Sequence, residues 1–293
     1  MGKIFRVALS GDFRKADGSP TFPDFDLTPL RAAPDVEMQF LESHSPLKAS
    51  QLDDFDALIL LGHRFAAESV PASGRLAVIA RFGVGYDSVD VAACTAADIA
   101  LVITPDGVRR PVAVSIVAFL LALTGKLTTK DRLARMGAPG FAARGDHMGV
   151  GLVGRTFGSL GVGNIGAETF RLLQPFDMKF IAHDPFADRD LCAQLGIELV
   201  TIEDLFARAD VLSVSCPLTP ETHHIVNAQR LALMKPTAYL INTARGPIVD
   251  QQALTQVLRE RRIAGAGLDV FEVEPPDSND PLLSLDNVIL APH

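Results

Sequence analysis

Short apolar runs alternate with segments of helical periodicity along most of the chain. In the first third, runs of strand length end in polar turns, and we expect strands over Ile4–Leu9, Ala57–Leu61, Leu76–Ala80 and Leu101–Ile103. Ala32–His44 is ambiguous, whereas Ser10–Pro29, rich in Gly, Pro, Asp and Phe, predicts an irregular loop. Apolar strands separated by helices are typical of a parallel sheet that helices cover on both faces.

A second series of the same kind begins near Thr156. Amphipathic helices are expected over Ile165–Leu173 and Gln251–Arg261. The series is long enough to form a complete doubly wound domain by itself. Its expected strands are Phe157–Val162, Met178–His183, Val211–Cys216, Ala238–Asn242, Ala264–Val270 and Val288–Ala291.

A long apolar run, Val112–Leu123, lies between the two series and follows Arg109, Arg110 and Pro111. A helix that is apolar on every side is usually buried between layers. We expect this helix to join two domains, with a boundary near residues 104–111. The run is shorter than the ~20 residues that span a bilayer, so we expect no transmembrane helix.

Composition narrows the class of protein. The 293 residues are 48% hydrophobic and 21% charged, the balance of a globular protein with two domains. The net charge of -8 argues against a nucleic-acid partner, because phosphate binding needs an excess of clustered Lys and Arg. No long apolar segment precedes a cleavage site near the N-terminus, which favours a cytoplasmic protein. Cys94, Cys192 and Cys216 have neither disulfide nor zinc-ligand spacing, so we predict no metal site.

A glycine-rich turn is the first indication of chemistry. Gly161, Gly163 and Gly166 have the GxGxxG spacing between an expected strand and an expected helix. In that context the glycines permit a tight turn, let the backbone approach a pyrophosphate and let the helix pack close to the strand. The turn therefore predicts a dinucleotide site.

An acidic residue follows at the spacing that a dinucleotide site requires. Asp184 ends the next expected strand, 18 residues beyond Gly166, close to the ~20 residues typical of a ribose-binding carboxylate. A carboxylate there accepts hydrogen bonds from the ribose hydroxyls of NAD and repels the 2′-phosphate of NADP. The alternative for Asp184 is a strand-end cap beside Pro185, but the order of the elements favours NAD.

Three further segments end expected strands at the same edge of the sheet, where ligands of open parallel sheets bind. His223 and His224, by contrast, predict a polar helix surface rather than a metal site, because no carboxylate or cysteine stands at ligand spacing. The three segments are Cys216–Thr222, Ile241–Gly246 and Gly267–Pro275, and the chain closes with Asn287–His293.

These motifs resemble those of the D-isomer-specific 2-hydroxyacid dehydrogenases, the family of phosphoglycerate dehydrogenase and hydroxypyruvate reductase. The resemblance covers about Leu76 to His293 and rests on five motifs in order, which are Gly154–Gly158 leading into the glycine fingerprint, Pro217–Thr222, Thr243–Gly246, Leu268–Pro275 and Pro292–His293.

The family resemblance implies an α/β fold of two doubly wound parallel-sheet domains. A flavodoxin-like substrate domain is expected over residues 1–105, completed by sequence after residue 293, and a Rossmann NAD-binding domain over residues 106–293. The resemblance also implies an NAD-dependent oxidoreductase that acts as a homodimer. Its small-molecule partner is a 2-hydroxy or 2-oxo acid, and we expect neither nucleic acid nor membrane as a partner.

The resemblance further implies roles for individual residues. Arg245 is expected to bind the substrate, Glu274 to pair with His293, and His293 to donate the proton. The backbone N–H groups of Val84 and Gly85 are expected to hold the substrate carboxylate. The implied cofactor-binding residues are Gly161, Gly163, Asn164, Ile165, Gly166, Asp184, Cys216, Pro217, Thr222, Thr243, Ala244, Arg245 and Asp269.

Each of these residue types suits the reaction. Reduction of a 2-oxo acid needs a hydride at the carbonyl carbon, a proton at its oxygen and a hold on the neighbouring carboxylate. Arginine offers a permanently charged planar fork for the carboxylate and the carbonyl. Histidine exchanges a proton near neutral pH, and a neighbouring carboxylate orients its ring.

Several alternatives stay open at this level. A dinucleotide-sensing, corepressor-like binding protein could use the same fold, but a sensor needs no proton donor beside the nicotinamide. A formate dehydrogenase is less favoured, because those proteins carry Gln where this chain has Glu274. Glu272 is the next candidate for the partner of His293. His63 and Arg64 suit either a hydroxylated or phosphorylated acid or a surface role, and the sequence does not name the 2-hydroxy acid.

Overall fold

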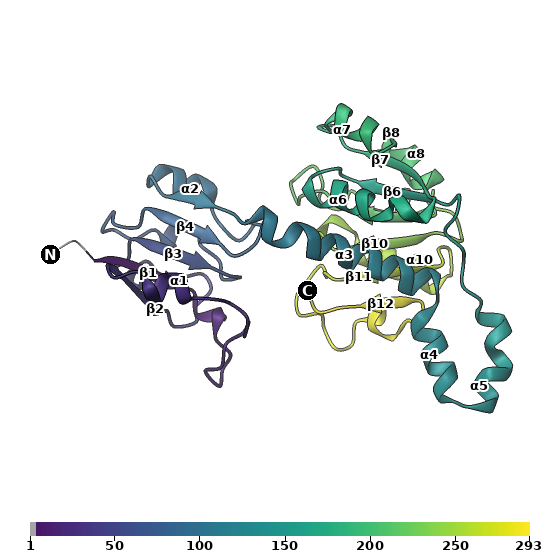
Figure 1. Ribbon diagram of the computed structural model, residues 1–293, viewed down its shortest axis with the longest axis horizontal. Coiled ribbons are helices and arrows are strands. Elements are labelled where there is room, and N and C mark those ends of the chain that lie inside the picture. Colours follow the sequence, from purple (N-terminus) through teal and green to yellow (C-terminus); the bar gives the residue numbers. More distant parts are fainter. Residues whose placement is uncertain (1–3) are drawn as a thin grey trace. The chain divides into compact units, whose positions relative to one another are not determined.

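The protein is described here by a computed structural model that covers residues 4–293, and it divides into two compact units between Val108 and Arg109. Figure 1 labels the elements of both units along the chain. A parallel sheet forms the middle layer of each unit. This arrangement confirms the predicted class of two doubly wound α/β domains.

The N-terminal unit contains a five-stranded sheet in the order β2-β1-β3-β4-β5. Every neighbouring pair is parallel, and Val7 of the central part of β1 lies opposite both Met38 and Ala57. This strand order is that of flavodoxin-like folds. The strands are β1 (Phe5–Leu9), β2 (Val36–Phe40), β3 (Ala57–Leu60), β4 (Val78–Arg81) and β5 (Ala100–Val102).

The two faces of this sheet bury separate cores. Leu58, Ile79 and Cys94 are buried on the face covered by α2 (Val91–Ala96). The other face buries Leu9, Phe13 and Leu27 beneath α1 (Thr28–Ala32) and the segment that follows β1. The segment predicted as an irregular loop is therefore packed, because its Phe side chains form part of a core, and the ambiguous stretch after it resolves into the end of α1 and β2.

The C-terminal unit contains a seven-stranded sheet in the order β12-β11-β10-β9-β6-β7-β8. All neighbouring strands are parallel, and the order reverses between β6 and β9, where doubly wound sheets bind ligands. Strand β8 was not predicted from the sequence, because an edge strand of three residues is too short to show an apolar pattern. The strands are β6 (Thr156–Leu160), β7 (Lys179–His183), β8 (Ile197–Leu199), β9 (Val211–Val214), β10 (Tyr239–Asn242), β11 (Gly265–Leu268) and β12 (Val288–Leu290).

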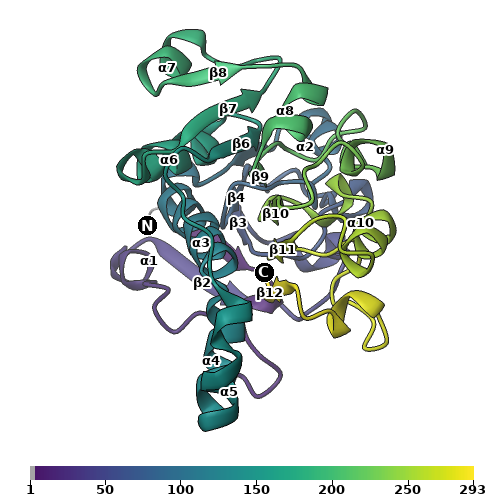
Figure 2. The same ribbon diagram turned by 90° about the vertical axis from the view of Figure 1, so that its right-hand side faces the viewer.

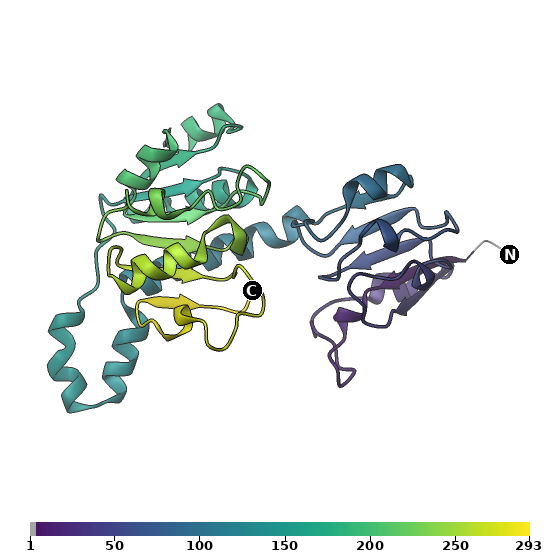
Figure 3. The same ribbon diagram turned by 180° about the vertical axis from the view of Figure 1, so that it is seen from behind.

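Helices cover both faces of this second sheet, as Figures 1 and 3 show from opposite sides. One face packs against α3 and α6, which bury Ile116 and Phe170. The opposite face packs against α8, α9 and α10, and α10 buries Leu254 and Leu258 one turn apart. These helices are α3 (Pro105–Thr124), α6 (Asn164–Leu173), α7 (Arg189–Gln194), α8 (Ile202–Arg208), α9 (Ala228–Leu231) and α10 (Gln251–Arg259).

Helix α3 differs from its prediction in two ways. It begins at Pro105 and holds Pro111 in its interior, so it is longer than the apolar run. It is also buried on one face only, because Val114 and Leu121 are 49% and 42% exposed. By length and composition it is the one helix within residues 4–293 that could cross a membrane. A core helix passes the same test, and the buried face of α3 packs on the sheet.

A helical hairpin projects from the C-terminal unit. It consists of α4 (Leu127–Arg135) and α5 (Ala138–Ala142), and Figures 1 and 2 show that it points away from the seven-stranded sheet. A side chain at Gly140 would collide with the Leu133 carbonyl oxygen, which lies 1.8 Å from the position of a Cβ atom, so the two helices need a glycine there. Short 3₁₀ helices complete the described elements at Gly11–Phe13, Ala49–Gln51, Ala67–Ser69, Ala143–His147, Gln174–Phe176, Gly246–Ile248 and Pro281–Ser284.

Candidate active site

The glycine fingerprint forms the turn between β6 and α6. Gly161 has a φ of +100°, and a Cβ atom there would lie 2.8 Å from the Ser215 carbonyl oxygen. A Cβ atom at Gly166 would lie 2.7 Å from the Gly161 carbonyl oxygen, so both positions need glycine. At Gly163, by contrast, a Cβ atom would meet nothing within 4 Å. This open space at the N-terminus of α6 fits a pyrophosphate, which the exposed N–H groups and the helix dipole attract.

Asp184 lies directly after β7 and is tied to the glycine turn. Its Oδ2 accepts the N–H of Val162 at 2.8 Å, and its Oδ1 accepts the N–H of Phe186 at 2.8 Å. Each carboxylate oxygen can accept a second hydrogen bond. The carboxylate therefore has a fixed position and acceptor capacity left for the two hydroxyls of a ribose.

The loop after β9 contains Cys216, Pro217 and Thr222. The Thr222 hydroxyl donates to the Pro217 carbonyl oxygen at 2.6 Å and accepts the Thr219 N–H at 2.7 Å, which closes the loop into a compact turn. Burial raises the pKa of the Cys216 thiol to about 11, so at neutral pH this side chain is an uncharged neighbour of the fingerprint.

The loop after β10 carries Thr243, Ala244 and Arg245. Asn242 is 1% exposed; its Oδ1 accepts the Ala244 N–H and its Nδ2 donates to the Arg245 carbonyl oxygen, both at 3.0 Å. The sequence analysis did not single out Asn242, although an amide at the end of an apolar strand is a signal for such a role. Asn242 thereby sets the path of the backbone that presents Arg245.

Gly246 brings this loop against the loop that follows β11. A Cβ atom at Gly246 would lie 1.8 Å from the carbonyl oxygen of Phe271, so the two backbones can approach only because the residue is glycine. The N–H of Asp269 donates to the Asn242 carbonyl oxygen at 2.9 Å. Arg245 and Asp269 are therefore held on adjacent loops at the carboxyl edge of one sheet.

Glu274 and His293 lie in contact at this edge. The Oε1 of Glu274 accepts the N–H of Phe271 at 2.9 Å, and its Oε2 lies 2.8 Å from Nδ1 of His293. The side chains are 37% and 48% exposed. A cavity of about 550 Å³ adjoins the pair, and apolar side chains, among them Phe271, Leu283 and Leu290, line it. The oriented imidazole of His293 therefore lies beside a cavity with an apolar lining.

Glu272, two residues earlier, belongs to a different pair. Its Oε1 lies 2.8 Å from Nε2 of His224, and its Oε2 accepts the N–H of Gln251 at 3.3 Å. The prediction of a polar helix surface at His223 and His224 is wrong: both lie in a turn, with stacked rings and a φ of +50° at His224. Pairing with Glu272, an acid distant in sequence, holds His224 in the turn.

In the N-terminal unit, Val84 and Gly85 lie half-buried in the loop after β4. Gly83 precedes them with a φ of +137°; its N–H donates to the hydroxyl of Thr104 at 2.9 Å and its carbonyl accepts the Thr104 N–H at 2.9 Å. The hydrogen bonds on both sides of Gly83 fix the start of this loop.

His63 and Arg64 follow β3 in the same unit. The His63 side chain is 12% exposed, with Nε2 3.0 Å from the Ser43 hydroxyl and Nδ1 3.8 Å from a carboxylate oxygen of Asp12, whereas Arg64 is exposed. The sequence analysis did not single out Asp12, which lies inside the segment predicted as a loop. The two doubly wound sheets and the glycine fingerprint together define a dinucleotide-binding α/β protein.

Comparisons with known proteins identify the family. Residues 117–293 match the family model described as "D-isomer specific 2-hydroxyacid dehydrogenase, NAD binding domain". The chain is 41% identical over 245 residues to the glyoxylate reductase of Korarchaeum cryptofilum, covering 83% of this chain and 74% of that protein. It is 38% identical over 282 residues to the glyoxylate reductase of Thermofilum pendens, covering 92% and 82%.

A solved structure agrees with these sequence matches. The D-lactate dehydrogenase of Aquifex aeolicus, in complex with NAD and lactic acid, is 27% identical with a TM-score of 0.82, covering 98% of this chain and 88% of that one. The chain therefore belongs to the D-isomer-specific 2-hydroxyacid dehydrogenase family. It is an NAD-dependent oxidoreductase that acts on 2-hydroxy acids and 2-oxo acids, which excludes a non-catalytic sensor.

Proposed function

We propose that this enzyme reduces glyoxylate and related short 2-oxo acids, with Arg245, Glu274 and His293 as its catalytic residues. One observation carries the assignment: Glu274 lies on the loop after β11, which packs against the Arg245 loop, and it contacts His293, which follows β12 at the same edge of the sheet as the glycine fingerprint. The choice of glyoxylate is supported by the two glyoxylate reductases that the chain resembles over most of its length.

His293 acts as the proton donor in reduction. Its Nδ1 faces the Glu274 carboxylate, so Nε2 is the atom that transfers the proton to the carbonyl oxygen of the substrate. Glu274 is held by the Phe271 N–H and therefore orients the imidazole. Reduction uses imidazolium and oxidation uses neutral imidazole, so the same pair serves both directions.

Arg245 binds the substrate carboxylate and polarises the reacting carbonyl. A planar guanidinium can form two parallel hydrogen bonds, which fixes the face of the carbonyl that reacts. We assign the backbone N–H groups of Val84 and Gly85 as further carboxylate donors. Residues 1–105 would then form the substrate domain and residues 106–293 the NAD-binding domain.

The fingerprint and the neighbouring loops hold the cofactor, which supplies the hydride when bound. Asn164 and Ile165 begin α6 and offer N–H groups to the pyrophosphate, while Asp184 accepts hydrogen bonds from the ribose. The remaining cofactor-binding residues in this assignment are Gly161, Gly163, Gly166, Cys216, Pro217, Thr222, Thr243, Ala244, Arg245 and Asp269.

A substrate panel tests the proposed function. Purified enzyme is mixed with NADH and glyoxylate, hydroxypyruvate, pyruvate or phosphonooxypyruvate, and the loss of NADH absorbance is followed. We expect the highest kcat/KM with glyoxylate or hydroxypyruvate. A higher kcat/KM with a phosphorylated acid would contradict the substrate assignment, and the absence of turnover with every 2-oxo acid would contradict the catalytic assignment.

The enzyme would act as a soluble cytoplasmic homodimer, without nucleic-acid or membrane partners. The projecting α4–α5 hairpin supports self-association, because it exposes Leu127, Met136 and Phe141, each about 60% exposed. A second copy of the chain would bury these side chains. Sedimentation equilibrium tests this: Phe141→Glu should yield monomers, whereas Phe186→Glu, at a residue 95% exposed elsewhere, should leave a dimer.

A further inference from the structure

The segment from Ser10 to Phe25 contacts two neighbouring loops at the carboxyl edge of the five-stranded sheet. One is the Leu61–Arg64 loop, which follows β3, and the other is the Phe82–Gly85 loop, which follows β4. The second loop contains Val84 and Gly85, and the proposed function assigns no role to the segment itself.

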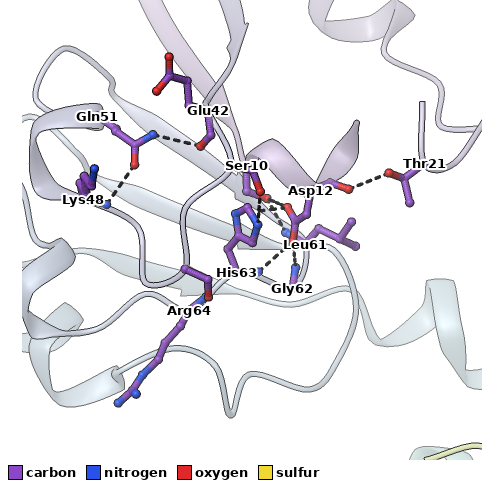
Figure 4. Close-up of polar contacts among 12 residues, drawn as sticks. Ser10, Asp12, Thr21, Glu42, Lys48, Gln51, Leu61, Gly62, His63 and Arg64 are labelled. Atoms are coloured by element: carbon purple, nitrogen blue, oxygen red, sulfur yellow. Dashed lines mark hydrogen bonds and ion pairs between the residues drawn. The ribbon is translucent and has the colours of Figure 1, made fainter. Parts of the chain in front are cut away.

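Asp12 connects this segment to the loop after β3, as Figure 4 shows. Its Oδ2 accepts the N–H of Gly62 at 2.7 Å and the N–H of His63 at 2.9 Å, and its Oδ1 accepts the Ser10 hydroxyl at 2.5 Å. The Ser10 oxygen in turn accepts the N–H of Leu61 at 3.0 Å. One carboxylate and one hydroxyl thus hold three consecutive backbone N–H groups, and hydrogen bonds to a charged group are the strong ones.

Aromatic packing connects the same segment to the loop after β4. The ring of Phe82 lies among three rings of the segment, with centroid distances of 4.8 Å to Phe25, 5.5 Å to Phe13 and 5.6 Å to Phe22. Phe13 and Phe25 are themselves stacked at 5.0 Å. Phe82 directly precedes Gly83, and its N–H donates to the Leu60 carbonyl oxygen at 2.8 Å. The ring cluster therefore anchors the residue from which the Gly83–Gly85 backbone starts.

We propose that the Ser10–Phe25 segment positions these two loops for binding of the substrate carboxylate. Asp12 acts through the backbone of Gly62 and His63, and Phe25 acts through Phe82. The inference rests on the proposed function, in which the N–H groups of Val84 and Gly85 hold that carboxylate. The N–H groups of Val84 and Gly85 must both point at one carboxylate. If their loop were free to move, each binding event would have to order it, which costs binding free energy.

Asp12 and Phe25 are positioning residues by this argument, and loss of either weakens substrate binding without touching the hydride or proton step. Their signature is therefore a higher KM with little change in kcat. Oxamate, which carries the same carboxylate as the substrate and is not reduced, must lose affinity by the same factor. NADH affinity must stay constant, because the cofactor residues belong to the other unit.

The aromatic contact is tested with Phe25→Leu and a matched control, Phe55→Leu. Phe55 is 8% exposed and belongs to the core on the other face of the same sheet. Phe25→Leu should raise the KM for glyoxylate and the inhibition constant of oxamate about three- to tenfold, the range for ordering one side chain. Phe55→Leu should lower Tm and leave both constants unchanged. Equal effects of the two variants, or unchanged constants for Phe25→Leu, would overturn the proposal.

The Asp12 contact is tested by graded replacement. Asn keeps an acceptor oxygen for the loop N–H groups and Ala does not, so KM should rise from wild type to Asp12→Asn to Asp12→Ala. Asp56→Asn is the control and should leave KM unchanged. Asp56 directly precedes β3, at the opposite edge of the same sheet, and accepts the N–H of Arg6 at 2.7 Å. If Asp12→Ala fails to fold, Asp12→Asn decides alone, and wild-type KM in it would overturn the role of Asp12.

Arg245→Lys, assayed alongside, distinguishes a failure of the proposed function from a failure of the positioning proposal. If it leaves kcat/KM unchanged, the proposed function fails and the inference fails with it. If it lowers kcat/KM while Phe25→Leu and Asp12→Ala keep the wild-type KM, only the positioning proposal is wrong.

Discussion

The two sheets present different kinds of groups at their carboxyl edges. At the edge of the seven-stranded sheet lie the ionisable side chains of Asp184, Arg245 and the Glu274–His293 pair. Each forms a hydrogen bond with the backbone or with a neighbouring side chain. In the five-stranded sheet the corresponding loops are shaped by glycine conformation, the hydrogen bonds of Asp12 and a cluster of aromatic rings. In the proposed function, the edge of the seven-stranded sheet carries the groups that react, and the edge of the five-stranded sheet offers backbone donors.

This difference divides the expected effects of substitution. A change in an ionisable side chain of the C-terminal unit removes a chemical group, so it should lower kcat/KM or the affinity for NADH. A change in the loops of the N-terminal unit alters only the direction of backbone N–H groups, so it should raise KM.

The largest effect is expected at His293. His293→Gln removes the proton donor and should lower kcat/KM for glyoxylate roughly 10²- to 10⁴-fold, the range for a lost general acid. NADH binding, measured by fluorescence titration, should be nearly unchanged. His224→Gln is the matched control, because His224 forms an analogous pair with Glu272. Equal losses in the two variants would show that the two histidines do not differ in role.

Arg245→Lys should cost less, because the positive charge remains. Hydrogen bonds to charged groups contribute about 1.5 to 3 kcal/mol, so loss of the bidentate grip should lower kcat/KM roughly 10- to 100-fold. Steady-state kinetics with glyoxylate measures the loss, and NADH affinity should not follow it. Wild-type turnover in this variant would refute the role of Arg245.

Asp184→Ser should weaken NADH binding by about 1 to 3 kcal/mol, because hydrogen bonds from a ribose to a carboxylate are lost. The same change should narrow the preference for NADH over NADPH, since it removes a negative charge that repels the 2′-phosphate. Asp188→Ser is a suitable control, because Asp188 caps α7 by accepting the N–H groups of Asp190 and Leu191. If wild-type enzyme uses NADPH as well as NADH, Asp184 does not select the cofactor.

The smallest effect is expected at Glu274, whose Oε2 lies 2.8 Å from Nδ1 of His293. Glu274→Gln keeps a side chain of the same shape that can still accept a hydrogen bond from the imidazole. It should therefore lower kcat/KM for glyoxylate only about two- to tenfold, the difference between hydrogen bonds to charged and to neutral groups. Glu272→Gln should leave kcat/KM unchanged, because Glu272 pairs with His224. Equal kcat/KM in the two variants, measured by steady-state kinetics, would contradict the assigned pairing.

The sequence was most informative where function constrains the backbone. The spacing of Gly161, Gly163 and Gly166 and the position of Asp184 predicted the cofactor turn, and the structure shows why two of these positions admit no other residue. Local pattern was least informative for Ser10–Pro29 and for the three-residue strand β8. In the first case a loop-like composition concealed a cluster of rings, because aromatic packing between distant residues leaves no periodic signal.

By itself, the sequence determined the class of fold and the glycine turn between strand and helix, because apolar periodicity and glycine spacing are local properties. The family followed from the resemblance of five ordered motifs. The resemblance implied that Glu274 pairs with His293 and left Glu272 as the alternative, and the tertiary structure distinguished the two by placing Glu272 against His224. Glu272 and Glu274 are two residues apart and chemically alike, and their partners lie 48 and 19 residues away in sequence. The loop after β11 packs closely against Gly246, and its hydrogen bonds direct the Glu272 and Glu274 carboxylates to different histidines. Pairing between residues so distant in sequence depends on the folded geometry rather than on residue type.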